Sequence, residues 1–188
     1  MARWRVLAID DDLDILELVE MTLQHRYDVL SLESGVNALK IVEAFQPDLI
    51  ILDIMMPKVT GYHIIEELKR DKATSKLPVI LLSAKDTIRD QRYGYKLGAT
   101  TYLTKPFQPE RLLRNVDNIF EHTPPNRTPK KWSLEEARNR VRVIEGKDPE
   151  PTRDDDSTKK SAAGPLLSSS KTVHHREHVD DDDKKWRG

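Results

Sequence analysis

Short apolar runs alternate with helix-like segments over the first 122 residues, and this alternation limits the fold more than any other feature of the chain. Between the runs, apolar residues recur three and four positions apart, as they do in helices that bury one face. A regular strand–helix alternation predicts a parallel sheet with helices on both faces. The five apolar runs that we interpret as strands are residues 5–9, 27–32, 49–52, 79–83 and 100–104.

Polar residues stand at the carboxyl ends of these apolar strands. In a parallel α/β sheet the carboxyl ends meet at one edge, and ligands bind in the crevice beside that edge. We therefore expect the side chains at the strand ends to lie close together. They are, in chain order, Asp10, Asp11, Asp12, Asp53, Ser83, Lys105 and Pro106.

The chemistry of these side chains favours a metal-assisted reaction of a phosphoryl group. Carboxylates at one spot repel each other, and a hard divalent cation such as Mg²⁺ would compensate their charge. The ammonium of Lys105 and the hydroxyl of Ser83 would add a receptor for anionic oxygens. Asp53 then becomes a candidate nucleophile that forms an acyl phosphate. Asp12 is interpreted as the cap of the first helix.

Four stretches of sequence together closely resemble the receiver domain of two-component response regulators. They are VLAIDDDLDIL, PDLIILDIMMPKVTGYHIIEELK, LPVILLSAK and GATTYLTKPF, and they occur in order between residues 4 and 122. The resemblance implies a CheY-like receiver domain at residues 1–122. The implied fold is α/β and flavodoxin-like, a (βα)5 unit with a parallel five-stranded sheet in the order 2-1-3-4-5.

The resemblance assigns the acidic residues to phosphorylation and metal binding. Asp53 matches the aspartate that accepts a phosphoryl group from a histidine kinase or a histidine phosphotransfer protein. The implied Mg²⁺ ligands are Asp10, Asp11, Asp53 and the backbone carbonyl of Met55. The implied function is therefore a Mg²⁺-dependent conformational switch in phosphorelay signalling, and not an enzyme that turns over a separate substrate.

Other positions match the residues that respond to phosphorylation. Ser83 matches the switch hydroxyl, and Lys105 matches the lysine that pairs with the phosphoryl group. Tyr102 matches the aromatic residue whose ring swings inward on activation, and the family match implies a cis bond before Pro106.

The chain departs from the DNA-binding branch of this family at two positions. Two acidic residues usually precede the switch aromatic in that branch, whereas this chain has Thr100 and Thr101. The departure puts the usual charged dimer interface in doubt. We expect no direct binding to DNA, and an output through contacts with a downstream protein of unknown identity.

Two alternative functions stay open at this point. A receiver fold can serve as a docking module without being phosphorylated. Phosphatases of the haloacid dehalogenase type also use an aspartyl nucleophile with Mg²⁺, but they need a second aspartate two residues later, where this chain has Met55. General acid–base catalysis would lack its residue there.

The composition changes after residue 122. Residues 123–132 are rich in proline and are interpreted as a linker, and residues 147–188 as a disordered polar tail. Between them, residues 133–146 predict a short amphipathic helix with a capping box formed by Ser133 and Glu136. The helix is short enough to need a partner. It either docks through its apolar face or remains a fraying appendage, and that face carries Leu134, Ala137, Val141 and Ile144.

Composition excludes several other classes of protein. The chain has no cysteine, which rules out disulfides and thiolate metal sites. Its formal net charge of −1 creates no overall attraction to nucleic acid or membranes. No run of about 20 apolar residues is present. We therefore expect a cytoplasmic protein without membrane contact.

Overall fold

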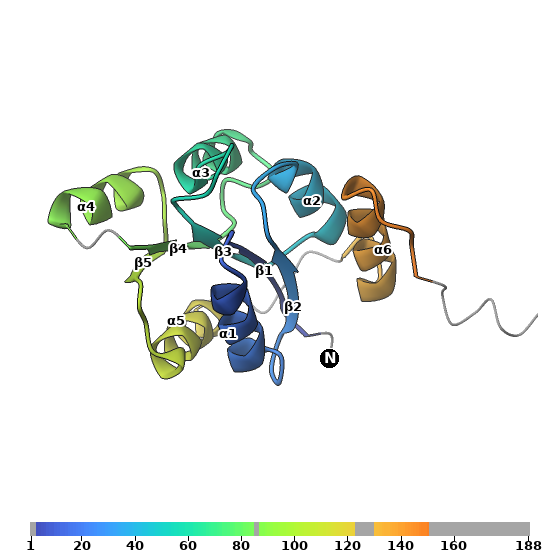
Figure 1. Cartoon of the computed structure of the whole chain (residues 1–188), viewed down its shortest axis with the longest axis horizontal. Helices are drawn as coiled ribbons and strands as arrows, with labels where there is room; N and C mark the ends of the chain where they lie inside the picture. The colour runs from blue at the N-terminus through green and yellow to red at the C-terminus, as the bar shows by residue number, and fades with distance from the viewer. Residues whose placement is uncertain (1–2, 85–86, 123–129, 151–188) are drawn as a thin grey trace, which may run out of the picture. The chain divides into compact units, whose positions relative to one another are not determined.

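The computed structural model describes residues 3–84, 87–122 and 130–150 of the 188-residue chain. Strands and helices alternate along the chain, and one further helix follows (Figure 1). The strands are β1 (Arg5–Ile9), β2 (Asp28–Leu32), β3 (Leu49–Asp53), β4 (Val79–Ser83) and β5 (Thr101–Thr104). The helices are α1 (Leu13–Leu23), α2 (Ala38–Phe45), α3 (Gly61–Arg70), α4 (Ile88–Lys96), α5 (Pro109–Glu121) and α6 (Leu134–Ile144).

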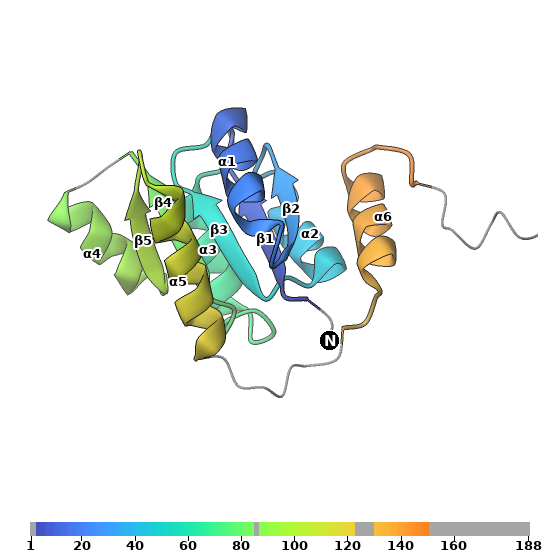
Figure 2. The ribbon, with the colours of Figure 1, turned by 90° about the horizontal axis from the view of Figure 1, so that it is seen from below.

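All neighbouring strands pair in parallel, in the order β2-β1-β3-β4-β5. This order confirms the flavodoxin-like prediction. Helices α1 and α5 cover one face of the sheet, and α2, α3 and α4 cover the other (Figures 1 and 2). Every residue of β1, β3 and β4 is buried, as expected for strands that are covered on both faces.

Two hydrophobic clusters hold the layers together, one on each face of the sheet. Successive side chains of a strand point to opposite faces. In β1, Val6 and Ala8 therefore join the cluster under α1 and α5, whereas Leu7 and Ile9 join the cluster under α2 and α3. The sheet is fixed between both layers, so the carboxyl ends of its strands form a rigid edge for a site.

Helix ends follow local sequence signals. The side chain of Asp12 accepts a hydrogen bond from the backbone N–H of Asp14 at 3.0 Å, so Asp12 caps α1 as predicted. The capping box of α6 is also present. The N–H of Ser133 donates to Glu136 Oε2 at 2.8 Å, and the N–H of Glu136 donates to Ser133 Oγ at 3.2 Å.

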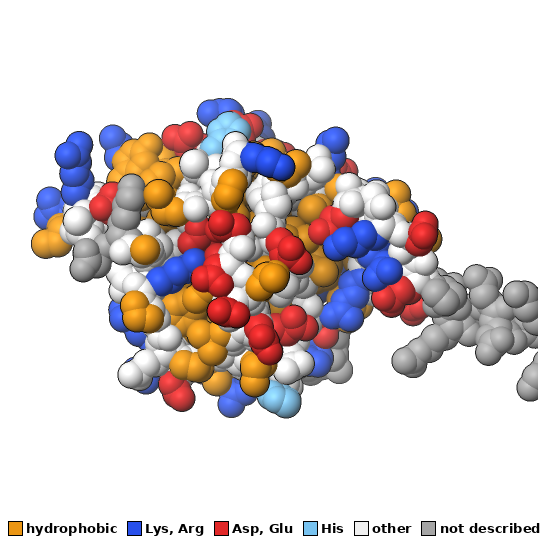
Figure 3. All heavy atoms as spheres, viewed as in Figure 1, with side chains coloured by type: hydrophobic (Ala, Val, Ile, Leu, Met, Phe, Trp, Pro, Cys, Tyr) orange, Lys and Arg blue, Asp and Glu red, His pale blue; other side chains and the backbone are white. Residues whose placement is uncertain are grey.

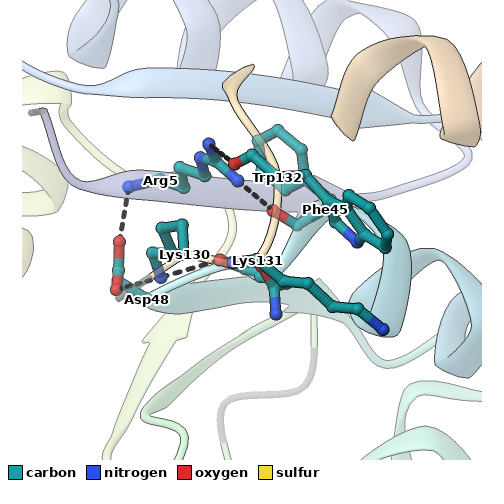
Figure 4. Close-up of polar contacts among 7 residues, drawn as sticks. Arg5, Phe45, Asp48, Lys130, Lys131 and Trp132 are labelled. Carbon is teal, nitrogen blue, oxygen red and sulfur yellow. Dashed lines mark hydrogen bonds and ion pairs between the residues drawn. The ribbon is translucent and has the colours of Figure 1, made fainter. Parts of the chain in front are cut away.

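Residues 130–150 pack on the receiver unit. Lys130, Lys131 and Trp132, which the sequence analysis placed at the end of a linker, contact the start of β1 and the end of α2 (Figure 4). Helix α6 then lies beside α2, with Ala137 and Val141 fully buried. Docking is therefore the arrangement that the structure adopts for this helix.

Two parts of the predicted organisation lie outside the described residues. These are the segment 123–129 and the tail from residue 151 onward. Among the helices of the described part, none has the length and apolar composition needed to cross a membrane.

Candidate functional site

The polar residues predicted to converge do so at the carboxyl edge of the sheet. Asp10 follows β1, Asp53 ends β3, Ser83 ends β4 and Lys105 follows β5. Figure 3 shows acidic side chains gathered in the middle of one face of the molecule, with basic side chains beside them.

Three carboxylates form a compact acidic cluster at this edge. Asp10 and Asp53 are 1% and 3% exposed, while Asp11 is exposed to solvent. One carboxylate oxygen from each lies within 4.8 Å of the others. Burial raises the pKa of Asp10 above its ordinary value, and the negative charge of Asp53 adds to this effect. An all-oxygen donor set of this kind fits a hard divalent cation such as Mg²⁺.

Lys105 bridges the two buried carboxylates. Its ammonium nitrogen lies 2.7 Å from Asp10 Oδ2 and 2.7 Å from Asp53 Oδ1. Burial by itself would lower the pKa of Lys105, but the hydrogen bonds to the two carboxylates and the attraction of their charges together outweigh burial and raise the pKa. The lysine is therefore held as a cation beside both acids. Its bond to Pro106 is cis, as the family resemblance implied.

The backbone after β3 orients the carboxylate of Asp53. The N–H of Met55 donates a hydrogen bond to Asp53 Oδ2 at 2.5 Å, which leaves Oδ1 facing Lys105. The Met55 side chain is exposed. The loop then returns to the strand, because the N–H of Gly61 donates to the carbonyl of Ile54 at 3.0 Å.

Gly61 belongs to the site although the sequence analysis did not predict it. A Cβ atom at this position would lie 2.1 Å from the backbone oxygen of Asp53. Only glycine permits this approach of α3 to the strand that carries the acceptor candidate. One sequence feature could have pointed to this role of Gly61. It is a glycine at the first position of α3, directly after Thr60, whose side chain caps the helix.

Ser83 and Tyr102 lie together beneath the site. Ser83 is fully buried, Tyr102 is 6% exposed, and their side chains are hydrogen-bonded. Burial raises the pKa of Tyr102 above its ordinary value, while the hydrogen bond with Ser83 acts in the opposite direction. The Tyr102 ring therefore occupies an inward position. Gly94 of α4 makes room for it, since a Cβ there would lie 3.0 Å from the ring.

Two further tyrosines, which sequence reasoning missed, extend from Tyr102 toward the surface. Burial, together with the nearby hydroxyl of Tyr102, raises the pKa of Tyr62 to about 12. The Tyr62 ring meets that of Tyr93 edge-on, with centroids 4.9 Å apart. Tyr93 is partly exposed on α4. Aromatic contacts between α3 and α4 depend on the packing of two helices, so no short motif predicts them.

Thr100 and Thr101 lie away from the acidic cluster. They stand at the amino end of β5, whereas the cluster lies at the carboxyl edge. Thr100 is tied to the start of β4, because its N–H donates to the carbonyl of Val79 at 2.8 Å and its hydroxyl accepts from the N–H of Val79 at 3.2 Å.

Comparison with known families gives a match over more than half of the chain. Residues 6–117 match the family described as the response regulator receiver domain. This range contains all of the residues that the structure brings together at the carboxyl edge.

Individual relatives match the same part of the chain. The DNA-binding dual master transcriptional regulator RpaA of Synechocystis sp. is 41% identical over 120 residues, which cover 63% of this chain and 50% of RpaA. The chain thus spans about half the length of that relative. Protein PilH of Pseudomonas aeruginosa is 34% identical over 117 residues, which cover 62% of this chain and 97% of PilH.

A solved structure shows the same fold. The chemotaxis protein CheY4 of Vibrio cholerae superposes with a TM-score of 0.59 and is 32% identical. The superposition covers 63% of this chain and 99% of CheY4.

Proposed function

The chain belongs to the response regulator receiver family, and on that premise we propose that Asp53 accepts a phosphoryl group from a histidine kinase or a histidine phosphotransfer protein. The observation that supports this proposal is the placement of Lys105 between two buried carboxylates, 2.7 Å from Asp53 and 2.7 Å from Asp10. Such an arrangement provides a nucleophile and a cation for the transferred group at one rigid edge.

In the proposed step, Asp53 Oδ1 attacks the phosphorus atom. The new O–P bond forms while the P–N bond of the donor's phosphohistidine breaks, and the electron pair returns to the donor's nitrogen. The hydrogen bond from the N–H of Met55 to Oδ2 holds the carboxylate plane during the attack. Lys105, which contacts Oδ1 before the reaction, would follow the negative charge to the phosphoryl oxygens.

Asp10, Asp11 and Asp53 are the residues that would hold Mg²⁺, with the Met55 carbonyl as a further ligand. When bound, this cation would offset the charge that develops on the phosphoryl oxygens. The pairing of Lys105 with both buried acids offsets part of the repulsion between their charges.

Ser83 and Tyr102 are the proposed switch residues. A phosphoryl group on Asp53 would compete for the Ser83 hydroxyl, which in this structure is hydrogen-bonded to Tyr102. The position of Ser83 would thereby bias the position of the Tyr102 ring, and with it the surface formed by α4 and β5. A local charge change would thus select between two arrangements of one packed region.

We propose an output through protein–protein contacts in the cytoplasm rather than through direct binding to DNA. The near-zero net charge of the chain supports this, because it provides no general attraction to phosphate backbones. The chain would act as an acceptor switch, and any catalysis would concern only its own phosphorylation and dephosphorylation.

The test is the intact mass of the full chain after incubation with acetyl phosphate and Mg²⁺. We expect the mass of one phosphoryl group to be gained by the wild type, and no gain with EDTA or in Asp53→Asn. Asp148→Asn, which changes an exposed carboxylate near the end of the described chain, serves as the matched control and should gain the group normally. A wild type that gains no mass under any condition would support a docking module that is not phosphorylated.

A further inference from the structure

Helix α6 buries a continuous apolar face against α2. Ala137 and Val141 are both 0% exposed, and Leu134 and Ile144 pack at the border of the same cluster. Figures 1 and 2 show α6 alongside α2, on the side of α2 away from α3. By contrast, Val143 on the same helix is 62% exposed. The burial is therefore specific to one face, as expected for a helix with a fixed partner.

The residues before α6 satisfy the carboxyl end of α2. The last carbonyls of a helix lack partners within the helix and carry its partial negative charge. Here Lys130 donates to the Gln46 carbonyl at 2.9 Å and to Asp48 Oδ1 at 2.5 Å. The N–H of Lys131 donates to Gln46 Oε1 at 2.7 Å. Figure 4 shows Lys130 and Lys131 beside Asp48.

A buried arginine depends on the same segment. Arg5, at the start of β1, is 5% exposed. Its guanidinium donates to the Phe45 carbonyl at 2.9 Å and to the Trp132 carbonyl at 2.8 Å (Figure 4). Undocking of residues 130–150 would remove the second acceptor from a buried cation, which is costly. Arg5 therefore ties the sheet to a residue 127 positions later in the chain.

Helix α6 also contacts an edge strand of the sheet. Strand β2 is an edge strand, and the exposed backbone of an edge strand can pair with other chains. Arg138 of α6 donates to the Val29 carbonyl of β2 at 3.2 Å. A side chain of α6 therefore occupies a backbone acceptor on β2.

These anchors lie at the opposite end of the sheet from the acidic cluster. Arg5 begins β1 and Asp48 precedes β3, whereas Asp10 and Asp53 lie at the carboxyl ends of the same strands. A five-residue strand spans about 16 Å, which is too far for a direct contact between these anchors and the carboxylate of Asp53. A change of charge at Asp53 therefore does not act on the anchors through a direct contact.

We infer that residues 130–150 are a constitutive part of the receiver unit, and that the outer face of α2 has α6 of the same chain as its permanent partner, with or without a phosphoryl group on Asp53. The α2 face is then closed to other proteins, and downstream partners bind elsewhere on the receiver. The statement that phosphorylation leaves α6 docked rests on the proposed function. The docking of α6 on α2 does not depend on that function.

The test is amide hydrogen exchange of α6 in the full chain, with Val141→Asp and Val143→Asp as a matched pair on one helix. Val141→Asp would place a carboxylate in the α2 interface, so we expect the protection of α6 amides to fall by a factor on the order of 100. Val143→Asp would place its carboxylate in solvent, and the protection should stay close to that of the wild type. If the Val141→Asp variant does not fold, Val141→Ala and Val143→Ala provide the same comparison.

The wild type is measured before and after acetyl phosphate and Mg²⁺, with the intact mass taken on the same samples. Equal protection of α6 in both forms is the expected result. Loss of protection only in the phosphorylated form would overturn the inference, since α6 would then be a releasable arm. Equal protection in the two aspartate variants would also overturn it. If no mass is gained, the proposed function fails, and the pair of variants still decides whether α6 is docked.

Discussion

Gly61 lies so close to Asp53 that a Cβ atom at position 61 would come within 2.1 Å of the Asp53 backbone oxygen. Backbone atoms cannot yield as a flexible side chain can. We predict that Gly61→Ala lowers the free energy of unfolding by more than about 3 kcal/mol, because α3 or β3 must move. Chemical denaturation of the purified variant measures this.

Gly146→Ala is the control for this substitution. Within the described part of the chain, and apart from its own chain neighbours, no atom lies within 4 Å of a Cβ at Gly146, although its φ of +74° disfavours a side chain. Its cost should be limited to about 1 kcal/mol from backbone conformation. Equal losses for the two variants would show that the close approach to Asp53 does not determine the role of Gly61.

Lys105→Met should destabilise the protein in a way that Mg²⁺ repairs. Removal of the ammonium leaves Asp10 and Asp53 buried without their shared cation, and we expect a loss of about 3 kcal/mol at neutral pH. A divalent cation at the same carboxylates would compensate the charge, so added Mg²⁺ should raise the melting temperature of the variant more than that of the wild type. Calorimetry with Mg²⁺ and with EDTA measures both effects. Lys40→Met, which changes an exposed lysine of α2, should respond to Mg²⁺ as the wild type does.

The ion pair between Lys130 and Asp48 should contribute measurably to the docking of residues 130–150. Its atoms are 2.5 Å apart, and the two side chains are 22% and 12% exposed. Both residues have other partners, so the stability lost in a single substitution exceeds the energy of this ion pair. A double-mutant cycle with Lys130→Ala and Asp48→Ala should give a coupling energy of about 1 kcal/mol. The more exposed pair of Lys147 and Glu145 should give a value near zero, and similar values for both pairs would contradict the prediction.

The capping box of α6 should make its stability depend on acid pH. The hydrogen bond from the Ser133 N–H, followed by the interaction with the Ser133 side chain, holds the pKa of Glu136 below its usual value of 4.5. A carboxyl group with a lowered pKa in the folded state stabilises that state above its unfolded pKa. This contribution is lost as the pH falls below 4.5 and through the folded pKa.

Glu136→Gln isolates this contribution. The stability difference between wild type and variant, taken from denaturation at a series of pH values, should be largest at about pH 6 and shrink as the pH falls below the usual glutamate pKa of 4.5. Glu135→Gln, one position earlier in the same first turn, lacks the reciprocal bond to Ser133 and should show a smaller change with pH. A difference that stays constant between about pH 6 and about pH 3 would contradict the role of Glu136.

Most of the fold and the main residues of the site were predictable from the sequence, because the signals involved are local and periodic. Five apolar runs separated by helical patterns define a parallel sheet, and the end of each run places its polar residue at the carboxyl edge. That rule predicts that Asp10, Asp53 and Lys105 lie together, and the structure places the ammonium of Lys105 2.7 Å from both carboxylates. The capping box of Ser133 and Glu136 was equally predictable, since its two residues are three positions apart.

Tertiary structure alone decided the contacts between segments that are far apart in the chain. The amphipathic pattern of α6 indicates that it needs a partner, but contacts between distant segments determine that this partner is α2, among them the bond of Lys130 to Asp48 across 82 positions. In the same way, Arg5 has no special signal in sequence, and its burial follows from acceptors at the end of α2 and before α6. In the sequence, Gly61 is only a glycine in the first turn of a helix. Its role follows from the close packing of β3 against it. Periodicity records which face of an element is apolar, whereas the identity of the surface that covers it depends on how the whole chain packs.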